Sequence, residues 1–269
     1  MAAPRRRPPR MLQVIETRDT SPHTRIITLG GAELEGFPED CPGAHLKLFL
    51  PRHGQSDPVL PTVGPKGITW PAPHRRPIVR TYSVRRFDPL RCHLDIEFVL
   101  HPRSGPASDW ARKARAGDRA GIAGPGGPHP MLPLAQHYLM VGDLSSLPAI
   151  TALLENMESD TRARVLCEVP DDRGIRELEC PPGVDVRWYV RRGPSPLPQI
   201  VEALPWPGAG TYAWIAGEHG AVVAIRDYLR ETHGLGRDSM YAVPYWKAGL
   251  HEDAYHQERH RVMDELEAA

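Results

Sequence analysis

The segment Arg80-Thr81-Tyr82-Ser83 places a guanidinium and an aromatic ring two residues apart in a stretch with the pattern of a strand. Side chains two residues apart lie on one face of a strand, so Arg80 and Tyr82 share a face and Ser83 points to the other. A guanidinium can neutralise a diphosphate, and a tyrosine ring can stack on a flat heterocycle. The pattern suits a dinucleotide with a large ring, such as FAD. It also fits a surface arginine beside a core tyrosine.

A second candidate phosphate site is the turn Gly105-Pro106-Ala107-Ser108. It opens a helix predicted over 107–116, with Ser108 or Asp109 as the N-cap and Gly117 as the end. Free N–H groups and the positive dipole end at the start of a helix suit a diphosphate. Because FMN has no diphosphate, Arg80 and this turn together favour FAD.

The composition excludes several other classes of protein. Lys and Arg total 33 and balance 33 Asp and Glu, so no global field attracts nucleic acid or anionic lipid. No apolar run approaches the ~18 residues that span a bilayer, and the protein is expected to be cytoplasmic. The four cysteines form no C-x-x-C pair, which argues against an iron–sulfur cluster or a structural zinc site. Electron transfer would therefore need a bound organic cofactor.

Hydrophobic periodicity divides the chain into two domains. Residues 1–10 carry four Arg and three Pro and are predicted to form a disordered tail. Short strands without intervening helices predict an antiparallel β-barrel over 11–130, interrupted by one helix. The Pro- and Gly-rich stretch at 124–130 is taken as the boundary.

The second domain, 131–249, alternates strands with helices, which predicts a parallel α/β sheet with ligands at the carboxyl ends of its strands. Its strands are expected at 138–141, 163–169, 184–190, 212–216 and 240–243, and its helices at 147–157 and 221–231. Residues 250–269 are predicted to form a charged helix. Its histidines lack the spacing of a zinc helix, so no metal site is expected.

Several ordered motifs over Leu12 to Gly249 resemble the siderophore-interacting protein family, which comprises flavin-containing ferric-siderophore reductases related to ferredoxin–NADP reductases. The matching motifs, in chain order, are Gly43-Ala44-His45-Leu46-Lys47-Leu48, Arg80-Thr81-Tyr82-Ser83, Phe98-Val99-Leu100-His101, Gly105 to Ala111, Gly124-Pro125-Gly126-Gly127, Gly142-Asp143, Leu147-Pro148-Ala149-Ile150, Ala216-Gly217-Glu218 and Tyr245-Trp246-Lys247-Ala248-Gly249.

The resemblance implies a flavin-binding barrel followed by an α/β domain like those that bind NAD(P)H. It implies that the flavin and nicotinamide contacts come from Arg80, Thr81, Tyr82, Ser83, Val99, His101, Gly105, Pro106, Ala107, Ser108, Trp110, Asp143 and Ser145. Three departures from the family pattern are visible. Pro102 replaces a Gly after the His, and Ser83 replaces a Thr and keeps the hydroxyl. Leu144-Ser145 replaces an acidic residue and a Thr, which removes a carboxyl group from the expected nicotinamide contacts.

The chain has only 4 Lys among its 33 basic residues, and Lys47 and Lys247 fall on segments that line the family's open pocket. Anionic ferric catecholates could be attracted by these compact ammonium groups, with Arg85 as a third cation. The alternative is that both lysines are solvated surface residues. Arg191 and Arg192 are candidates for an adenosine 2′-phosphate or a plain surface pair, and Tyr245 and Trp246 could pack near the flavin or close the sheet.

The resulting expectation is a cytoplasmic FAD-dependent ferric-siderophore reductase that releases Fe(II). The electron donor is NAD(P)H or reduced ferredoxin, and ferric siderophore is the substrate. The alternatives are an NAD(P)H–flavodoxin or ferredoxin reductase on the same scaffold, and a protein that binds flavin and siderophore without turnover.

Overall fold

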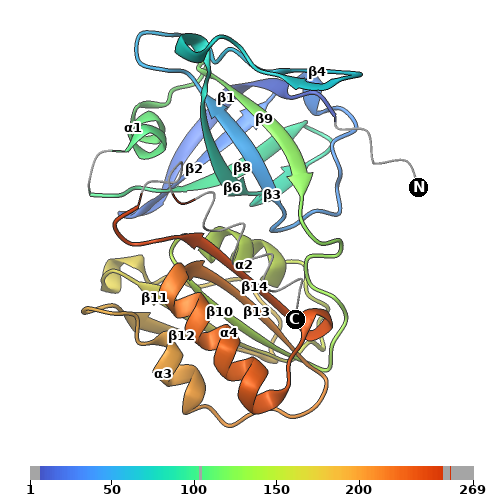
Figure 1. Cartoon of the computed structure of the whole chain (residues 1–269), viewed down its shortest axis with the longest axis vertical. Helices are drawn as coiled ribbons and strands as arrows, with labels where there is room; N and C mark the ends of the chain where they lie inside the picture. Colours follow the sequence, from blue (N-terminus) through green and yellow to red (C-terminus); the bar gives the residue numbers. More distant parts are fainter. Residues whose placement is uncertain (1–6, 103–104, 251–254, 256–269) are drawn as a thin grey trace. The chain divides into compact units, whose positions relative to one another are not determined.

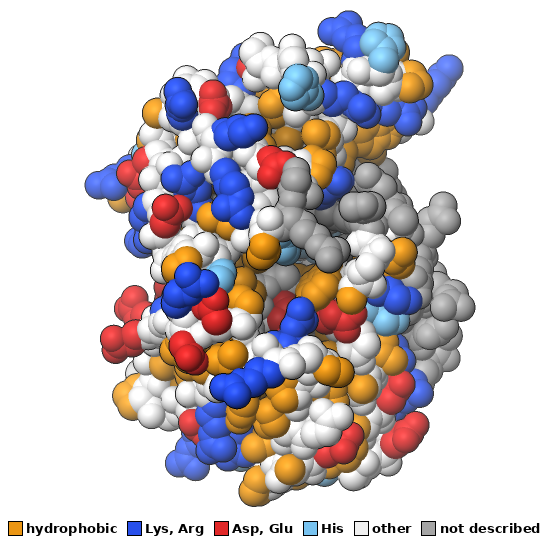
Figure 2. Space-filling view, turned by 90° about the vertical axis from the view of Figure 1, so that its left-hand side faces the viewer, with side chains coloured by type: hydrophobic (Ala, Val, Ile, Leu, Met, Phe, Trp, Pro, Cys, Tyr) orange, Lys and Arg blue, Asp and Glu red, His pale blue; other side chains and the backbone are white. Residues whose placement is uncertain are grey.

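The computed structural model describes residues 7–102, 105–250 and 255 (Figure 1). The chain divides into two compact units, Met1–Met131 and Leu132–Ala269. The sequence placed the change of domain one residue earlier. Among the described residues, no helix is long and apolar enough to cross a membrane. Figure 2 shows Lys and Arg side chains interspersed with Asp and Glu on the face that it draws.

The first unit is an antiparallel barrel, as predicted. Seven of its strands form one sheet in the order β6-β3-β9-β1-β2-β8-β7. The sheet curls so that the rings of Tyr82 on β6 and Phe98 on β8 lie 4.4 Å apart. The strands are β1 (Arg10–Ser21), β2 (Thr24–Gly30), β3 (His45–Leu50), β4 (Thr62–Gly64), β5 (Gly67–Thr69), β6 (Ile78–Ser83), β7 (Arg86–Asp88), β8 (His93–Val99) and β9 (Arg119–Gly126), with 3-10 turns η1 (Ala32–Leu34) and η2 (Pro73–Arg75).

Alternating apolar residues explain the barrel core. Leu46, Leu48 and Leu50 of β3 are fully buried, because every second side chain of a strand points the same way. Arg10 opens β1 and pairs with Ile122, so this strand begins at the last residue of the predicted tail. Residues 1–6 of that tail lie outside the described residues.

Helix α1 (Pro106–Lys113) begins and ends earlier than the sequence indicated. Its N-cap is Gly105, so the expectation of Ser108 or Asp109 was wrong. Pro106 occupies the first turn, where its fixed φ and missing N–H are favourable. Ser108 lies inside the helix, and its hydroxyl accepts a hydrogen bond from the backbone N–H of His101 at 3.1 Å.

The second unit is a five-stranded parallel sheet in the order β12-β11-β10-β13-β14, which confirms the predicted fold class. Figure 1 shows α3 and α4 on one face of the sheet and α2 on the other. The elements are β10 (His137–Asp143), α2 (Leu147–Leu154), β11 (Ala163–Val169), η3 (Asp172–Gly174), β12 (Val184–Val190), α3 (Leu197–Glu202), β13 (Thr211–Glu218), α4 (His219–His233), η4 (Arg237–Ser239) and β14 (Met240–Trp246).

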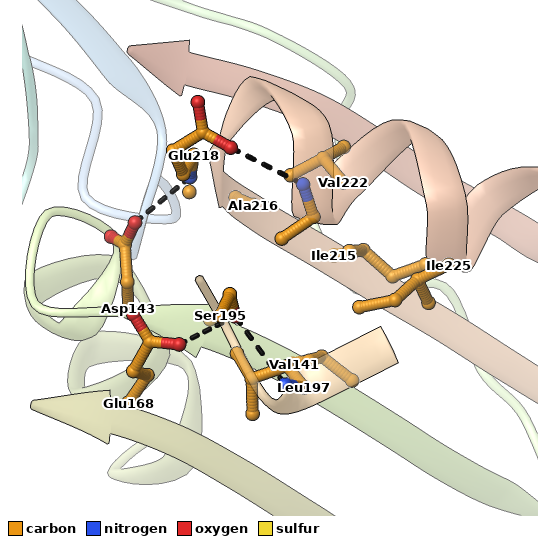
Figure 3. Close-up of a pocket in the computed structure, with 13 residues that line it drawn as sticks. Val141, Asp143, Glu168, Ser195, Leu197, Ile215, Ala216, Glu218, Val222 and Ile225 are labelled. Carbon is orange, nitrogen blue, oxygen red and sulfur yellow. Dashed lines mark hydrogen bonds between the residues drawn. The ribbon is translucent and has the colours of Figure 1, made fainter. Parts of the chain in front are cut away.

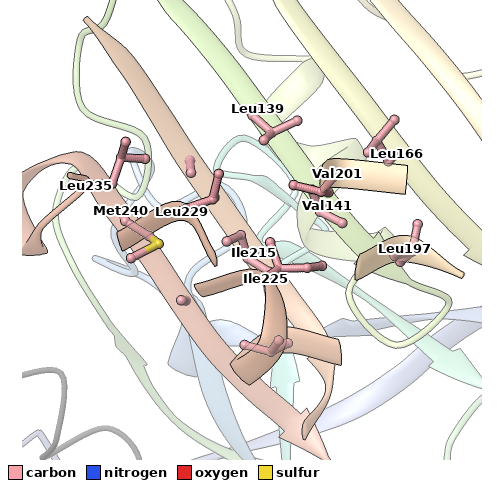
Figure 4. Close-up of a cluster of buried hydrophobic side chains, with 13 residues drawn as sticks. Leu139, Val141, Leu166, Leu197, Val201, Ile215, Ile225, Leu229, Leu235 and Met240 are labelled. Carbon is pink, nitrogen blue, oxygen red and sulfur yellow. The ribbon is translucent and has the colours of Figure 1, made fainter. Parts of the chain in front are cut away.

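A cluster of buried aliphatic side chains joins α3 and α4 to the sheet (Figure 4). It includes Leu139 and Val141 of β10 and Ile225 and Leu229 of α4, all at most 4% exposed. Burial of this apolar surface stabilises the packing of α3 and α4 on the sheet. The short helix α3 was not predicted from the sequence, and α2 ends at Leu154 rather than Met157.

The predicted C-terminal helix over 250–269 lies outside the described residues except for Leu250 and Tyr255. Tyr255 is buried, and its hydroxyl lies 2.9 Å from Nδ1 of His219 at the start of α4.

Candidate functional site

The Arg80-Thr81-Tyr82-Ser83 motif forms most of β6, which pairs with β3. The register sets Arg80 opposite Leu48 and Tyr82 opposite Leu46, so these two side chains share a face, as the alternation predicts. Arg80 and Tyr82 are half-buried, whereas Ser83 is buried.

The ring of Tyr82 belongs to a row of three aromatic side chains. Its centroid lies 4.4 Å from that of Phe98, which lies 5.7 Å from that of Trp110 on α1. This row brings β6, β8 and α1 together. Tyr82 is thereby held rigidly while part of its surface stays accessible, which suits stacking on a flat ring system.

The start of α1 is open. Among the described residues no side chain caps it, and a Cβ atom built on Gly105 would meet none of their atoms within 4 Å. The backbone N–H groups of the first helical turn have no partner within the helix, so they suit an anion. Arg80 lies on the neighbouring strand, with Nη1 donating to the backbone carbonyl of Val79 at 2.7 Å.

Lys47 contacts the Arg80-Thr81-Tyr82-Ser83 motif directly. Its Nζ donates to Oγ1 of Thr81, the directly opposite residue on β6, at 2.7 Å. From the sequence, Thr81 was expected to contact the cofactor and Lys47 to attract an anionic ferric chelate. Only the strand register shows that the ammonium group lies beside the motif.

Arg85 lies against a buried carboxylate of the barrel. Its Nε is 3.9 Å from Oε2 of Glu97, which is 2% exposed, and the Arg85 side chain is 13% exposed. Glu97 also accepts a hydrogen bond from the hydroxyl of Thr20 at 2.7 Å. A buried carboxylate of the barrel therefore lies beside the Arg85 guanidinium.

A separate pocket lies at the carboxyl ends of β10, β11 and β13 in the second unit (Figure 3). Asp143, Glu168 and Glu218 line it, and each ends or nearly ends its strand. Asp143 is 8% exposed, and its Oδ1 accepts hydrogen bonds from the backbone N–H and the hydroxyl of Ser145 at 2.8 and 2.5 Å. Three carboxylates around one pocket disfavour a phosphate there.

Glu168 is the most buried of the three carboxylates, at 4% exposed. Burial raises the pKa of Glu168 above its ordinary value, although the hydroxyl of Ser195 at 2.5 Å and Nη1 of Arg191 at 3.5 Å act in the opposite direction. The guanidinium of Arg191 also lies 5.7 Å from the ring centre of Trp246. Arg191 is thus held within the unit by an acid and an aromatic ring.

Two glycines make room for this arrangement. A Cβ on Gly142 would lie 2.1 Å from Oγ of Ser146, and one on Gly217 would lie 2.8 Å from the carboxylate of Asp143. Gly217 also has φ +148, which side-chain-bearing residues rarely adopt. These contacts explain why the Gly142-Asp143 and Ala216-Gly217-Glu218 motifs carry glycine.

The structure gathers the expected flavin residues in the first unit. There, Val99 is half-buried, His101 is exposed and Ala107 is buried. Asp143, Ser145 and Lys247 belong to the second unit. Sequence reasoning missed Glu168 and Ser195, although a carboxylate at the end of an apolar strand was a usable signal. Within the described residues, no group of three or more His, Cys, Asp or Glu side chains could hold a metal ion.

The residues of the first unit fit an FAD. A half-exposed tyrosine, an arginine on the same strand face and an open helix N-terminus with a sterically free glycine supply the contacts that a ring and a diphosphate require.

A flavin-binding barrel followed by a parallel α/β unit defines the class of ferredoxin-reductase-like flavoproteins. The siderophore-interacting FAD-binding domain matches residues 13–129, and the siderophore-interacting protein domain matches residues 135–249. The chain belongs to the siderophore-interacting protein family.

Relatives and solved structures agree with this assignment. The chain is 40% identical to the ferric vibriobactin reductase ViuB of Vibrio cholerae over 262 residues, 96% of each chain. It is 31% identical to the NADPH-dependent ferric-chelate reductase of Escherichia coli over 242 residues, 89% of this chain and 93% of that one. The crystal structure of the siderophore-interacting protein SipS from Aeromonas hydrophila superimposes with a TM-score of 0.84 at 43% identity, covering 96% of this chain and 98% of the other.

Proposed function

We propose that this protein is an FAD-dependent reductase of ferric siderophores that releases iron as Fe(II) in the cytoplasm. The observation that carries the proposal is the joint presence of Tyr82, Arg80 and the open start of α1 in a domain of the FAD-binding family. All four cysteines are free thiols, in keeping with a reducing compartment.

Each residue of the Arg80-Thr81-Tyr82-Ser83 motif has a distinct task in this proposal. Tyr82 stacks on the flavin ring, and Ser83 offers a hydroxyl to its polar edge. Arg80 and the backbone N–H groups of the turn at 105–108 bind the diphosphate. Thr81 holds the ammonium group of Lys47 through the 2.7 Å hydrogen bond.

When bound, FAD would accept two electrons from the donor and pass them one at a time to Fe(III). The chain supplies position and charge. No acid–base pair is required at the iron, because weaker binding of Fe(II) allows the siderophore to release the metal.

Lysine side chains supply the attraction for anionic ferric chelates. Lys47 in the first unit and Lys247 in the second each present a compact ammonium charge. The third expected cation, Arg85, has the buried carboxylate of Glu97 beside it, which offsets part of its charge.

The donor is NAD(P)H or reduced ferredoxin. Support for a nicotinamide comes from the relative that is named an NADPH-dependent reductase. The carboxylates around the pocket in Figure 3 argue against phosphate binding inside that pocket. A nicotinamide dinucleotide would therefore place its phosphates elsewhere on the unit.

The deciding experiment is anaerobic stopped-flow mixing of the purified holoprotein, first with NADH, NADPH or reduced ferredoxin, and then with ferric chelates. We expect bleaching of the flavin spectrum by a donor and recovery on addition of ferric siderophore, with Fe(II) trapped by a chromogenic chelator. Release of FMN on denaturation would contradict the cofactor assignment. Stable chelate binding without Fe(II) would favour a siderophore-binding protein.

The lysine assignment is tested by Lys47→Glu and Lys247→Glu, with the exposed Lys66→Glu as the matched control. KM for an anionic ferric chelate should rise at low salt, and the effect should fade near ~1 M salt, where the Debye length is about 3 Å. A neutral ferric chelate should be much less affected. Equal effects on both chelates would refute the electrostatic role.

A further inference from the structure

Both neighbours of Lys247 in the chain are anchored by carboxylates. The indole N–H of Trp246 donates to Oδ2 of Asp143 at 2.7 Å, and the backbone N–H of Ala248 donates to Oε1 of Glu218 at 3.2 Å. We propose that Asp143 and Glu218 are positioning residues that hold Lys247 in place for an anionic ferric chelate. This inference rests on the proposed function of Lys247.

The two carboxylates act together. Oδ2 of Asp143 accepts the backbone N–H of Glu218 at 2.8 Å, in addition to the indole N–H of Trp246. With the two hydrogen bonds from Ser145 to Oδ1, Asp143 accepts four hydrogen bonds, which matches the capacity of an ionised carboxylate. Donors from the chain itself therefore use all four acceptor positions of the Asp143 carboxylate. Its role in this proposal is to hold Trp246 and Glu218 rather than to contact a nicotinamide.

Glu218 connects the segment after β14 to a rigid helix. Its Oε2 caps α4 by accepting the backbone N–H groups of Gly220 and Ala221 at 2.6 and 3.3 Å. Its other oxygen accepts the N–H of Ala248. A functional side chain is best positioned when its supports lie on regular elements, and here the supports are the ends of β10 and β13 and the start of α4.

The end of β14 carries a bulge beside these carboxylates. Pro244 pairs with Gly217 and Trp246 pairs with Glu218, so Tyr245 is an extra residue that forms a bulge. Asp143 holds the edge of the Trp246 ring, and the guanidinium of Arg191 lies 5.7 Å from its centre. Beyond Trp246 the chain forms a turn, in which the backbone N–H of Leu250 donates to the carbonyl of Lys247 at 3.1 Å.

The three motifs Gly142-Asp143, Ala216-Gly217-Glu218 and Tyr245-Trp246-Lys247-Ala248-Gly249 thus form one hydrogen-bonded unit around the backbone of Lys247. A purely structural role for Asp143 predicts loss of stability alone. A positioning role also predicts a loss of affinity for anionic chelates that depends on the presence of Lys247.

The test uses Asp143→Asn and Trp246→Phe in the full-length holoprotein, each alone and combined with Lys247→Ala. Trp246→Phe keeps a ring for Arg191 but removes the indole N–H. Trp206→Phe is the matched control, because Trp206 is a half-buried tryptophan of the same unit that stacks on His233. The probes are an anionic ferric tris-catecholate and a neutral ferric tris-hydroxamate, and the readouts are KM, kcat and chelate binding measured by fluorescence quenching.

We expect Asp143→Asn and Trp246→Phe to raise KM and Kd for the anionic probe on the order of tenfold, equivalent to about 1.4 kcal/mol. Neither variant should raise them further when Lys247 is already alanine. The neutral probe and Trp206→Phe should show little change.

Two outcomes overturn the inference alone. One is a folded Asp143→Asn or Trp246→Phe protein with wild-type affinity while Lys247→Ala binds weakly. The other is an equal loss with and without Lys247, which would indicate a general structural role. Wild-type affinity in Lys247→Ala overturns both the inference and the lysine part of the proposed function. A binding defect in Lys247→Ala without Fe(II) production would contradict the reductase but keep the positioning network.

Discussion

Replacing Gly217 with alanine should break the contact between β13 and Asp143. The added Cβ would lie 2.8 Å from both Cγ and Oδ2 of Asp143 and 3.2 Å from Oδ1. Asp143 cannot simply withdraw, because Ser145, Glu218 and Trp246 all donate hydrogen bonds to its carboxylate. The backbone at Gly217 also has φ +148, where an L-residue is strained.

Backbone strain and the loss of a hydrogen bond together determine the expected loss of stability. A side chain held in a sparsely populated backbone region costs about 1–3 kcal/mol. Displacing Asp143 would lose at least one hydrogen bond to a charged group, worth about 1.5–3 kcal/mol. The free energy of unfolding of the second unit should therefore fall by about 2.5–6 kcal/mol.

Urea unfolding followed by tryptophan fluorescence measures this change, since four of the six tryptophans lie in the second unit, at positions 188, 206, 214 and 246. Gly236→Ala is the matched control, because its φ is −109 and a Cβ there meets nothing within 4 Å. FAD content reports on the first unit and should be unchanged in both variants. A Gly217→Ala protein within about 0.5 kcal/mol of the wild type would refute the reasoning that Asp143 requires glycine at this position.

Three further predictions concern the flavin, the buried acid and the thiols. Tyr82→Ala should weaken FAD binding by about 0.5–1.5 kcal/mol beyond the lost contact area, and Arg80→Ala by about 1.5–3 kcal/mol; fluorescence titration measures both, and wild-type Kd values would place these residues away from the cofactor. Because burial raises the pKa of Glu168, the folded state holds its proton more tightly than the unfolded state, so this group lowers stability as pH rises from about 4.3 through the raised pKa. In unfolding curves recorded across this range, Glu168→Gln should lack that slope, and identical pH profiles would contradict the assignment. Burial raises the pKa of Cys41 to about 11 and that of Cys167 to about 12, so iodoacetamide should modify both only after unfolding, as mass spectrometry of native and denatured protein can show. Rapid labelling of either in the native state would contradict this.

The sequence by itself determined the two architectures, because periodicity is a local property of the chain. Apolar residues at alternate positions, as in β3, specify strands with one buried face. Apolar strands that alternate with helical stretches, as from Tyr138 to Val243, specify a parallel sheet. The sequence also determined that Arg80 and Tyr82 share a face, since two residues on one strand need no partner to define their relation.

Helix boundaries were less accessible. Ser108 has the residue type of an N-cap, but its hydroxyl is used by the N–H of His101, and Gly105 begins the helix. Capping preference is a weak local signal that a nearby backbone donor can override. The short helix α3 makes few turns, so it has little periodicity to detect.

Only the tertiary structure decided which distant side chains meet. Lys47 contacts Thr81 because of the β3–β6 register, and Asp143 contacts Trp246, 103 residues away, because β10, β13 and β14 end at the same edge of the sheet. Register depends on the packing of whole strand faces and on bulges such as that at Tyr245. A single residue's type and its neighbours in the chain carry no record of that packing, which is why Asp143 reads as a possible cofactor ligand in the sequence and as the anchor of Trp246 in the folded protein.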